Sequence, residues 1–414
     1  MLSTKPFNIS KTLVMEAFKN VKANAGSAGV DKVSIEMYEK NLKDNLYKLW
    51  NRMSSGSYFP PPVMGLAIPK KSGGERLLGI PTVADRVAQT AVKMVLEPQL
   101  EAVFLPDSYG YRPGKSAHDA IGITRERCWR YEWLVEFDIK GLFDNIPWDL
   151  LMKAVKRHTD CQWILLYIER WLKAPMRTED GKEINRTKGT PQGGVVSPVL
   201  SNLFLHYCFD KWISIKHPSV PWCRYADDGL FHCQSHEQAR AILDDTMKRF
   251  KDCGLDLHPE KTKIVYCKSS KNKIDYPIQS FDFLGYTFQN RSAKNSNTGE
   301  VFTTFTPAIS KKSLKNIKHR IKHGWRVKSM LQCNLQDIAK MVNPIIRGWV
   351  QYYGKYNKSK LAIIYRYINM ILKKWGQRKY KKLRESQARA RKWLKNVYEA
   401  NPKLFYHWNE MAVY

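Results

Sequence analysis

The spacing of apolar positions changes repeatedly along this chain, and each spacing predicts a different type of element. Between residues 8 and 53, apolar side chains such as Val14, Phe18 and Val21 recur every three or four positions, which predicts amphipathic helices. The same period predicts further helices at residues 85–100, 148–158, 163–172, 197–213, 235–253, 314–325, 338–353, 361–380 and 383–397. Shorter strand-like runs alternate with these helices, so the pattern predicts an α+β fold.

Three segments predict β-hairpins, two from pairs of short apolar runs and one from its turn signal. Residues 63–68 and 77–80 flank a Ser-Gly-Gly turn, and residues 177–188 contain Asp180-Gly181 as a turn signal. The third pair, residues 222–233, is rich in aromatic residues and is interrupted by Asp227-Asp228-Gly229. Its tip is therefore expected to carry two adjacent carboxylates. Residues 292–299 are rich in Ser, Asn and Gly and predict a loop or a domain boundary.

The hairpin with the two acids is chemically the most informative segment. Side chains alternate between the two faces of a strand, so neighbouring Asp227 and Asp228 converge only where a tight turn bends the backbone. A carboxylate pair held in this way suits Mg²⁺, which prefers oxygen ligands. The same sequence is also typical of a solvated surface turn. A third acid, Asp138, ends the predicted strand of residues 132–138 and favours the metal-binding interpretation.

The segment Tyr225-Ala226-Asp227-Asp228 resembles the active-site box of reverse transcriptases, a family that takes its third carboxylate from an earlier strand. Further segments are most similar to those of bacterial group II intron reverse transcriptases. They are Gly79-Ile80-Pro81-Thr82, Ser108-Tyr109-Gly110-Tyr111-Arg112-Pro113, Gly189-Thr190-Pro191-Gln192-Gly193-Gly194, Phe283-Leu284-Gly285-Tyr286 and Asn343-Pro344-Ile345-Ile346-Arg347-Gly348-Trp349. The resemblance implies a right-hand polymerase, with fingers and palm around an antiparallel sheet, followed by an α-helical thumb or maturase domain.

The resemblance also implies four regions along the chain. They are a helical N-terminal extension at residues 1–60, the reverse transcriptase fingers and palm at 61–295, the helical thumb or maturase domain at 296–382, and a basic helical tail at 383–414. No segment resembles the C-terminal nuclease module of some intron proteins, so we expect no second-strand DNA cleavage.

The implied reaction is attack of a primer 3′-hydroxyl on the α-phosphate of a dNTP. In the family, catalytic acids and a main-chain carbonyl hold two Mg²⁺ ions, for which Mn²⁺ is a substitute. The matching positions here are Asp138, Ile139, Asp227 and Asp228, of which the three Asp are the catalytic residues. Clustered carboxylates are also what two-metal chemistry itself requires.

The first hairpin resembles the part of the fingers that contacts the incoming nucleotide. By this resemblance Lys70 and Arg76 grip the triphosphate, Arg as a fork and Lys as a point charge. A solvated basic hairpin is the alternative, and Lys71 competes with Lys70 for the role.

Three other positions match nucleotide-contacting residues of the family. Phe143 would clash with a 2′-hydroxyl, although an aromatic at a strand end is also typical of a core. Gln192 is able to approach a nucleotide because glycines follow it. Lys261 would donate a proton to pyrophosphate, with Lys263 as the competing candidate.

Charge is distributed unevenly over the chain. The net charge is +31, and residues 311–414 hold 26 Lys and Arg against four acids, which leaves +9 for the first 310 residues. Charged helical faces are common simply because they face water. An imbalance of this size nevertheless repels itself unless a polyanion is bound, so the segment predicts nucleic-acid binding.

Composition excludes several other protein classes. A chain of 414 residues with 43% hydrophobic residues is expected to fold into two or three domains. No apolar run approaches the ~18–20 residues of a membrane span, and a signal peptide is lacking, so a cytoplasmic protein without a membrane partner is expected. The eight Cys show no zinc spacing and are expected to be small buried thiols, although Cys223 and Cys233 bracket the third hairpin.

The leading hypothesis is an RNA-directed DNA polymerase of a group II intron that also assists splicing. Its implied partners are an RNA template with a DNA or RNA primer, dNTPs, the intron RNA and target DNA. An RNA-binding splicing cofactor with a decayed polymerase is one alternative, and a host-adapted reverse transcriptase in defence or repair is another. The intact Asp138, Asp227 and Asp228 argue against decay. The sequence does not decide whether the protein dimerises.

Overall fold

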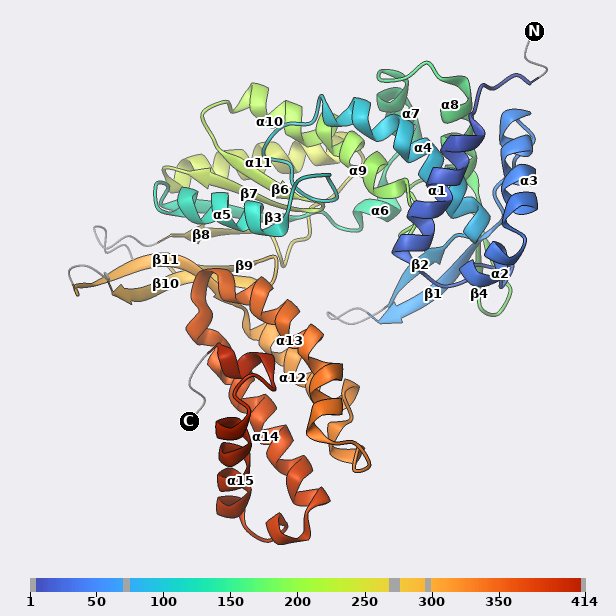
Figure 1. Ribbon diagram of the computed structural model, residues 1–414. Coiled ribbons are helices and arrows are strands. Elements are labelled where there is room, and N and C mark those ends of the chain that lie inside the picture. The colour runs from blue at the N-terminus through green and yellow to red at the C-terminus, as the bar shows by residue number, and fades with distance from the viewer. Residues whose placement is uncertain (1–4, 70–74, 268–275, 295–298, 411–414) are drawn as a thin grey trace. The chain divides into compact units, whose positions relative to one another are not determined.

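The computed structural model describes residues 5–69, 75–267, 276–294 and 299–410 (Figure 1). Two compact units emerge from its internal contacts. The first consists of Met1–Ala120 and Val135–Ile264, and the second of Ile121–Leu134 and Val265–Tyr414.

Helices open the first unit. They are α1 (Lys11–Asn24), α2 (Ile35–Lys40) and α3 (Leu42–Ser54). The hydroxyl of Ser10 accepts a hydrogen bond from the Leu13 amide at 3.0 Å, which caps α1. Val14, Phe18 and Val21 are buried on one face of α1, as their spacing predicted.

A mixed sheet follows, with strand order β2-β1-β4-β5. Its strands are β1 (Val63–Pro69), β2 (Glu75–Ile80), β4 (Met176–Thr178) and β5 (Glu183–Ile184). Antiparallel pairing of β1 with β2 and of β4 with β5 confirms two predicted hairpins. The parallel pairing of β4 with β1 was not predicted, because it joins segments more than 100 residues apart.

The remaining helices of the first unit largely match the predicted ranges. They are α4 (Val83–Glu101), α6 (Leu142–Asn145), α7 (Trp148–Lys156), α8 (Gln162–Lys173), α9 (Ser197–Leu205), α10 (Lys211–Lys216) and α11 (His236–Asp252). One difference is that the predicted helix of residues 197–213 contains a π-helical turn at His206–Asp210. π-Helical turns within α-helices are frequently found at functional sites. This one ends at the buried Asp210.

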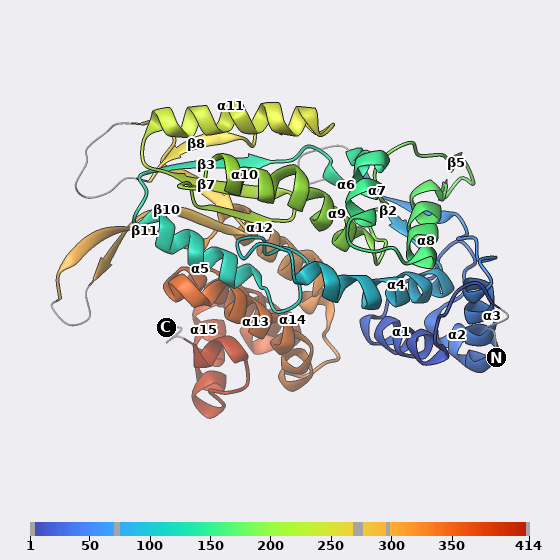
Figure 2. The same cartoon turned by 90° about the horizontal axis from the view of Figure 1, so that it is seen from above.

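A second sheet, with strand order β6-β7-β3-β8, carries the acidic hairpin. Its strands are β6 (Trp222–Tyr225), β7 (Asp228–Cys233), β3 (Trp133–Asp138) and β8 (Lys263–Tyr266). Helices α10 and α11 lie along this sheet in both views (Figures 1 and 2). Buried rings of Phe137, Phe209, Phe231 and Phe250 pack together at centroid distances of 5.1 to 5.8 Å. This aromatic core fixes β3 against β7.

The second unit consists of an antiparallel sheet and a helical region. Its sheet has the order β11-β10-β9, from β9 (Ser280–Phe283), β10 (Tyr286–Lys294) and β11 (Val301–Ile309). Its helices are α12 (Lys311–His319), α13 (Leu335–Asn357), α14 (Ala362–Lys379), α15 (Gln387–Ala400) and α5 (Ala117–Cys128) from Ile121 onward. The long β10–β11 hairpin was not predicted, and the Ser- and Asn-rich residues 295–298 between its arms lie outside the described residues.

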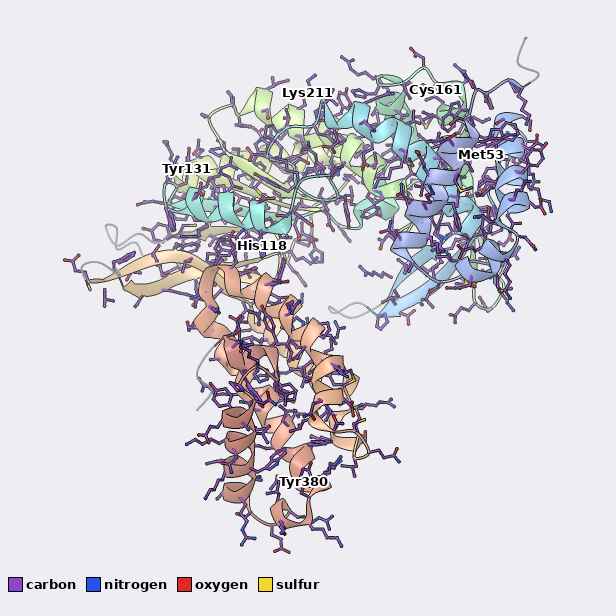
Figure 3. All side chains as sticks on the ribbon, in the orientation of Figure 1. Met53, His118, Tyr131, Cys161, Lys211 and Tyr380 are labelled. Atoms are coloured by element: carbon purple, nitrogen blue, oxygen red, sulfur yellow. The ribbon has the colours of Figure 1, made fainter. Side chains whose placement is uncertain are left out.

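Apolar faces of α12, α13 and α14 form the core of the helical region. Ile317, Ile338, Val342, Ile368 and Trp375 are among its buried members. Many nitrogen-tipped side chains project from these helices, as Figure 3 shows, in line with the excess of Lys and Arg in this segment. No helix in the described part of the chain is long and apolar enough to cross a membrane.

Candidate active site

The acidic hairpin forms as predicted. Tyr225 of β6 pairs with Asp228 of β7, so Ala226 and Asp227 make a two-residue turn. Ala226 has a φ of +57°, in the left-handed region that such turns use. The turn therefore holds Asp227 at the tip and Asp228 at the first position of β7.

Asp138 joins these two acids from the neighbouring strand. It ends β3, which lies next to β7 in the sheet, and its side chain is buried. The Ile139 amide donates a hydrogen bond to the Asp227 carbonyl oxygen at 3.1 Å, which ties the end of β3 to the hairpin turn. A hydrogen bond also connects the carboxyl groups of Asp228 and Asp138. Asp138 thus lies beside the pair Asp227 and Asp228, from which about 90 residues separate it in the sequence.

Burial and mutual repulsion disfavour full ionisation of this cluster. Burial raises the pKa of Asp227, and the charge of Asp138 adds to this effect. Burial also raises the pKa of Asp228 well above its usual range, reinforced by Asp227, by the hydrogen bond with Asp138 and by Glu136. Concentrated negative charge of this kind is relieved by a cation.

Lys261 supplies one such cation. Its Nζ lies 2.8 Å from Asp138 Oδ2. Burial works against its charge, but the hydrogen bond to Asp138 and the surrounding carboxylates raise the pKa of Lys261 overall. Lys263, the competing candidate, instead pairs with Glu136 at 3.2 Å. The structure therefore gives the two lysines different partners, and only Lys261 contacts the acidic cluster directly.

The carboxylate groups of Asp138, Asp227 and Asp228 are chemically suited to bind a divalent metal, but they are not arranged as a complete metal site. Among the described residues, no group of three or more His, Cys, Asp or Glu is arranged to hold a metal ion. The ammonium of Lys261, 2.8 Å from Asp138, compensates part of the charge that an ion would. Carboxylate oxygens are nevertheless the ligands that Mg²⁺ and Mn²⁺ prefer.

Arg224 anchors the hairpin from inside the protein, and sequence reasoning missed it. Its fully buried guanidinium makes a fork with Asp210 at 2.7 and 2.6 Å. It also donates to Ser108 Oγ at 2.7 Å, to Asn202 Oδ1 at 3.1 Å and to the Ala226 carbonyl oxygen at 3.1 Å. A charged residue inside an otherwise apolar strand was the available signal, since buried charges need partners.

The glycine-rich loop that carries Gln192 is held by a second buried network. The Gln192 carbonyl oxygen accepts from the Gly79 amide at 2.6 Å, which joins this loop to β2. Oε1 of Gln89 on α4 accepts from the Val195 amide at 2.7 Å, and its amide group donates to Asp85 at 2.9 Å. Neither polar residue of α4 was predicted to matter, because only the apolar stripe of that helix stands out in the sequence.

Phe143 and Arg76 lie at the surface of the first unit. Phe143 is half-buried on the short helix α6, so it is not enclosed as a core residue would be. Its ring meets Tyr111 edge to face, with centroids 6.3 Å apart. Arg76 is exposed and pairs with Ile68 across the β1–β2 hairpin. Lys70 and Lys71 lie outside the described residues.

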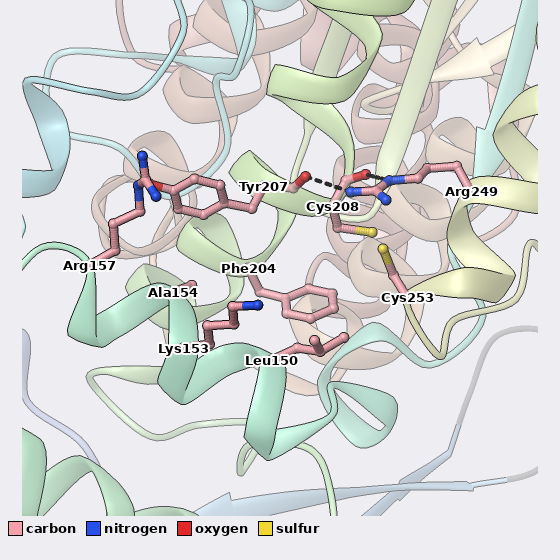
Figure 4. Close-up of a pocket in the computed structure, with 9 residues that line it drawn as sticks. All are labelled: Leu150, Lys153, Ala154, Arg157, Phe204, Tyr207, Cys208, Arg249 and Cys253. Atoms are coloured by element: carbon pink, nitrogen blue, oxygen red, sulfur yellow. Dashed lines mark hydrogen bonds between the residues drawn. The ribbon is translucent and has the colours of Figure 1, made fainter.

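A separate cavity of about 250 Å³ lies beside α7, the π-helical turn and α11. None of the three acids lines it. Figure 4 shows the sulfur atoms of Cys208 and Cys253 facing each other there. All eight cysteines are free thiols, and six of them are buried, including Cys223 and Cys233 of the hairpin. The prediction of small buried thiols is confirmed for those six.

Comparisons with known proteins agree with this arrangement. Residues 68–288, which contain all three acids, match the family described as reverse transcriptase (RNA-dependent DNA polymerase). Residues 314–394 match the group II intron, maturase-specific domain. The first match alone covers more than half of the chain.

Individual relatives point the same way. Protein YkfC of Escherichia coli is 32% identical over 320 residues, which cover 67% of this chain and 79% of YkfC. Group II intron-encoded protein LtrA of Lactococcus lactis is 34% identical over 201 residues, which cover 48% of this chain but 33% of LtrA. An uncharacterized 91 kDa protein in the cob intron of Schizosaccharomyces pombe is 26% identical over 89% of this chain and 52% of its own length. This chain therefore belongs to the reverse transcriptases, the RNA-dependent DNA polymerases, and within them to the group II intron type with a maturase-specific domain.

Proposed function

We propose that this chain copies RNA into DNA by two-metal nucleotidyl transfer and binds a group II intron RNA to assist its splicing and mobility. The observation that carries the first part is the cluster of Asp138, Asp227 and Asp228, brought from two strands into one buried place. An acidic cluster of this kind has no evident structural benefit, because the burial of like charges is costly.

The three Asp, with the main-chain carbonyl of Ile139, would hold the metal ions. When bound, two Mg²⁺ or Mn²⁺ ions supply stabilisation of the attacking and leaving oxygens. The raised pKa values of Asp227 and Asp228 fit this role, because carboxylates that repel one another gain most from a cation between them.

Lys261 has two parts in the proposal. It neutralises Asp138 while no nucleotide is bound, through the contact of 2.8 Å. Its raised pKa keeps it protonated in this contact. With a nucleotide in place, it donates its proton to the leaving pyrophosphate as a general acid.

Residues around the cluster bind and select the nucleotide. Arg76 and Lys70 bind the triphosphate, and Lys70 lies outside the described residues. Gln192 contacts the nucleotide from a loop that is tied to β2 through its own carbonyl oxygen. The half-buried ring of Phe143 excludes a 2′-hydroxyl and so selects dNTPs.

The charge of the C-terminal region supports the second part of the proposal. Its 26 Lys and Arg against four acids are suited to the phosphates of the intron RNA and of the template with its DNA or RNA primer. We propose a right-hand polymerase with fingers and palm at residues 61–295, a thumb or maturase domain at 296–382, and flanking regions at 1–60 and 383–414. Target DNA would be a further partner in mobility, within the cytoplasm.

Primer extension on an RNA template with Mg²⁺ and dNTPs tests the polymerase. We expect synthesis by the native chain and none by Asp227→Ala or Asp228→Asn, whereas Asp149→Asn, an exposed acid on α7, serves as a matched control. Intron RNA binding by Asp228→Asn should stay near the native level, because the variant changes metal ligands and not the basic helices. Absence of synthesis by a folded, RNA-binding native chain would favour a splicing cofactor with a decayed polymerase.

A further inference from the structure

Tyr111, in the loop between α4 and α5, combines a strained backbone with an exposed ring. Its φ of +59° lies in the left-handed region, which a bulky non-glycine residue seldom adopts. Its side chain is 51% exposed, so core packing does not explain the conformation. Strain of this kind persists only where the surrounding structure imposes it, and it clusters at functional sites.

The surrounding structure does impose it. The Tyr109 amide donates to the Arg224 carbonyl oxygen at 2.9 Å, and the buried Asn202 amide group donates to the Gly110 carbonyl oxygen at 2.7 Å. Gly110 lies so close to the hairpin turn that a Cβ atom there would be 2.4 Å from the Ala226 nitrogen. The loop is thereby fixed against the turn that carries Asp227.

The contacts of Tyr109 and Gly110 with the hairpin region place the Tyr111 ring beside Phe143. The two rings meet at an interplanar angle of 76° with centroids 6.3 Å apart, the edge-to-face arrangement that aromatic pairs favour. Partial burial raises the pKa of the Tyr111 hydroxyl, and the charge of Asp227 adds to it, so the ring also lies close to the acids. Phe143 itself sits on a helix of only four residues and is half-buried.

We propose that Tyr111 is a positioning residue for sugar discrimination, whose ring braces Phe143 in the orientation that excludes a 2′-hydroxyl. This inference rests on the proposed role of Phe143. The edge-to-face contact with Tyr111 holds this half-buried ring in one orientation, and a ring that turns aside would admit the larger ribose. The clamped loop supplies this support from a separate part of the chain.

The test measures kcat/KM for a dNTP and for the matching rNTP on an RNA template, and takes their ratio. Tyr111→Asn removes the ring, while asparagine tolerates positive φ and so keeps the loop conformation. We expect this variant to lower the discrimination ratio about three- to tenfold, in keeping with the strength of an edge-to-face pair. Tyr111→Phe keeps the ring and should retain native discrimination.

A double-mutant cycle shows whether Tyr111 acts through Phe143. In a Phe143→Ala background, Tyr111→Asn should lower discrimination no further. Tyr47→Asn is the matched control, since Tyr47 is 55% exposed and its ring is 5.7 Å from that of Trp50, far along the chain.

Several results would overturn the inference. Unchanged discrimination in Tyr111→Asn, with relaxed discrimination in Phe143→Ala, would refute the brace and leave the proposed role of Phe143 intact. An equal loss in both backgrounds would show that Tyr111 acts independently of Phe143. Lack of DNA synthesis by the unaltered chain would remove the polymerase itself and this inference with it.

Discussion

Replacement of Arg224 by methionine should destabilise the acidic hairpin more than any other single change at its base. The side chains of Arg224 and Asp210 are both fully buried and are joined by two hydrogen bonds of 2.6 and 2.7 Å. Methionine approximately fills the aliphatic volume, but it leaves the Asp210 carboxylate buried without its cation. Ser108 and the Ala226 carbonyl group lose a donor at the same time.

The magnitude follows from the unpaired charge. Removal of one partner of a buried ion pair costs about 3–5 kcal/mol, because the remaining charge keeps its desolvation penalty and loses its compensation. An Arg224→Met, Asp210→Asn double variant removes that charge and should recover at least about 1–2 kcal/mol of the loss. The exposed pair of Arg177 and Glu183, with side chains 45% and 43% exposed, gives a control in which Arg177→Met costs at most about 1 kcal/mol.

Hydrogen exchange of the amides in β6 and β7 measures the effect where it arises. Exchange reports local opening free energies, so the hairpin is resolved from the helices of the second unit. The reasoning would be refuted by an opening free energy in Arg224→Met within about 1 kcal/mol of the native value. It would equally be refuted by a double variant no more stable than the single one, since the unpaired carboxylate would then not be the cause.

Other predictions concern positions for which the structure supplies a matched comparison. Gly229→Ala should lower the free energy of unfolding by about 1–3 kcal/mol or more, since its Cβ would lie 2.0 Å from the buried Phe137 ring. Gly348→Ala, where the added Cβ meets open space, should be neutral or stabilising, and thermal unfolding of both variants measures the difference. Lys261→Met should slow single-turnover incorporation by about 10²-fold or more, while Lys263→Met should have a much smaller effect; equal effects would contradict the assignment. Burial raises the pKa of Asp85 to about 6, above ~3.9 in an unfolded chain, so the native state binds this proton more tightly. Stability should therefore fall by up to about 3 kcal/mol as pH rises from ~4 to ~6, and denaturant unfolding of Asp85→Asn should lack this slope.

Local patterns in the sequence were sufficient for most elements of the fold. The hairpin at residues 222–233, the strand that ends at Asp138 and the helices α13, α14 and α15 formed where apolar spacing and turn residues predicted them, whereas α5 was not predicted. These features depend on interactions between residues close in sequence, such as helix capping, strand alternation and turn geometry. The same patterns indicated the three acids, because carboxylates at a tight turn and at a strand end are unusual in an apolar setting.

Only the tertiary structure decided how distant segments are joined. The parallel pairing of β4 with β1, the proximity of Asp138 to Asp228, and the separate partners of Lys261 and Lys263 depend on contacts between residues far apart in the chain. A side chain's sequence neighbours do not specify such contacts.

The residues that hold the candidate site in place also depend on contacts between distant segments. Arg224 appears in the sequence as one basic residue among many, and its importance comes from burial beside Asp210. Tyr111 appears as an aromatic in a loop, and its proposed role depends on a backbone held at positive φ beside the hairpin turn. Sequence by itself determined which acidic and basic groups are available at the candidate site. Burial and long-range packing decided which of them meet and what holds them there, because both depend on the folded arrangement of the whole unit.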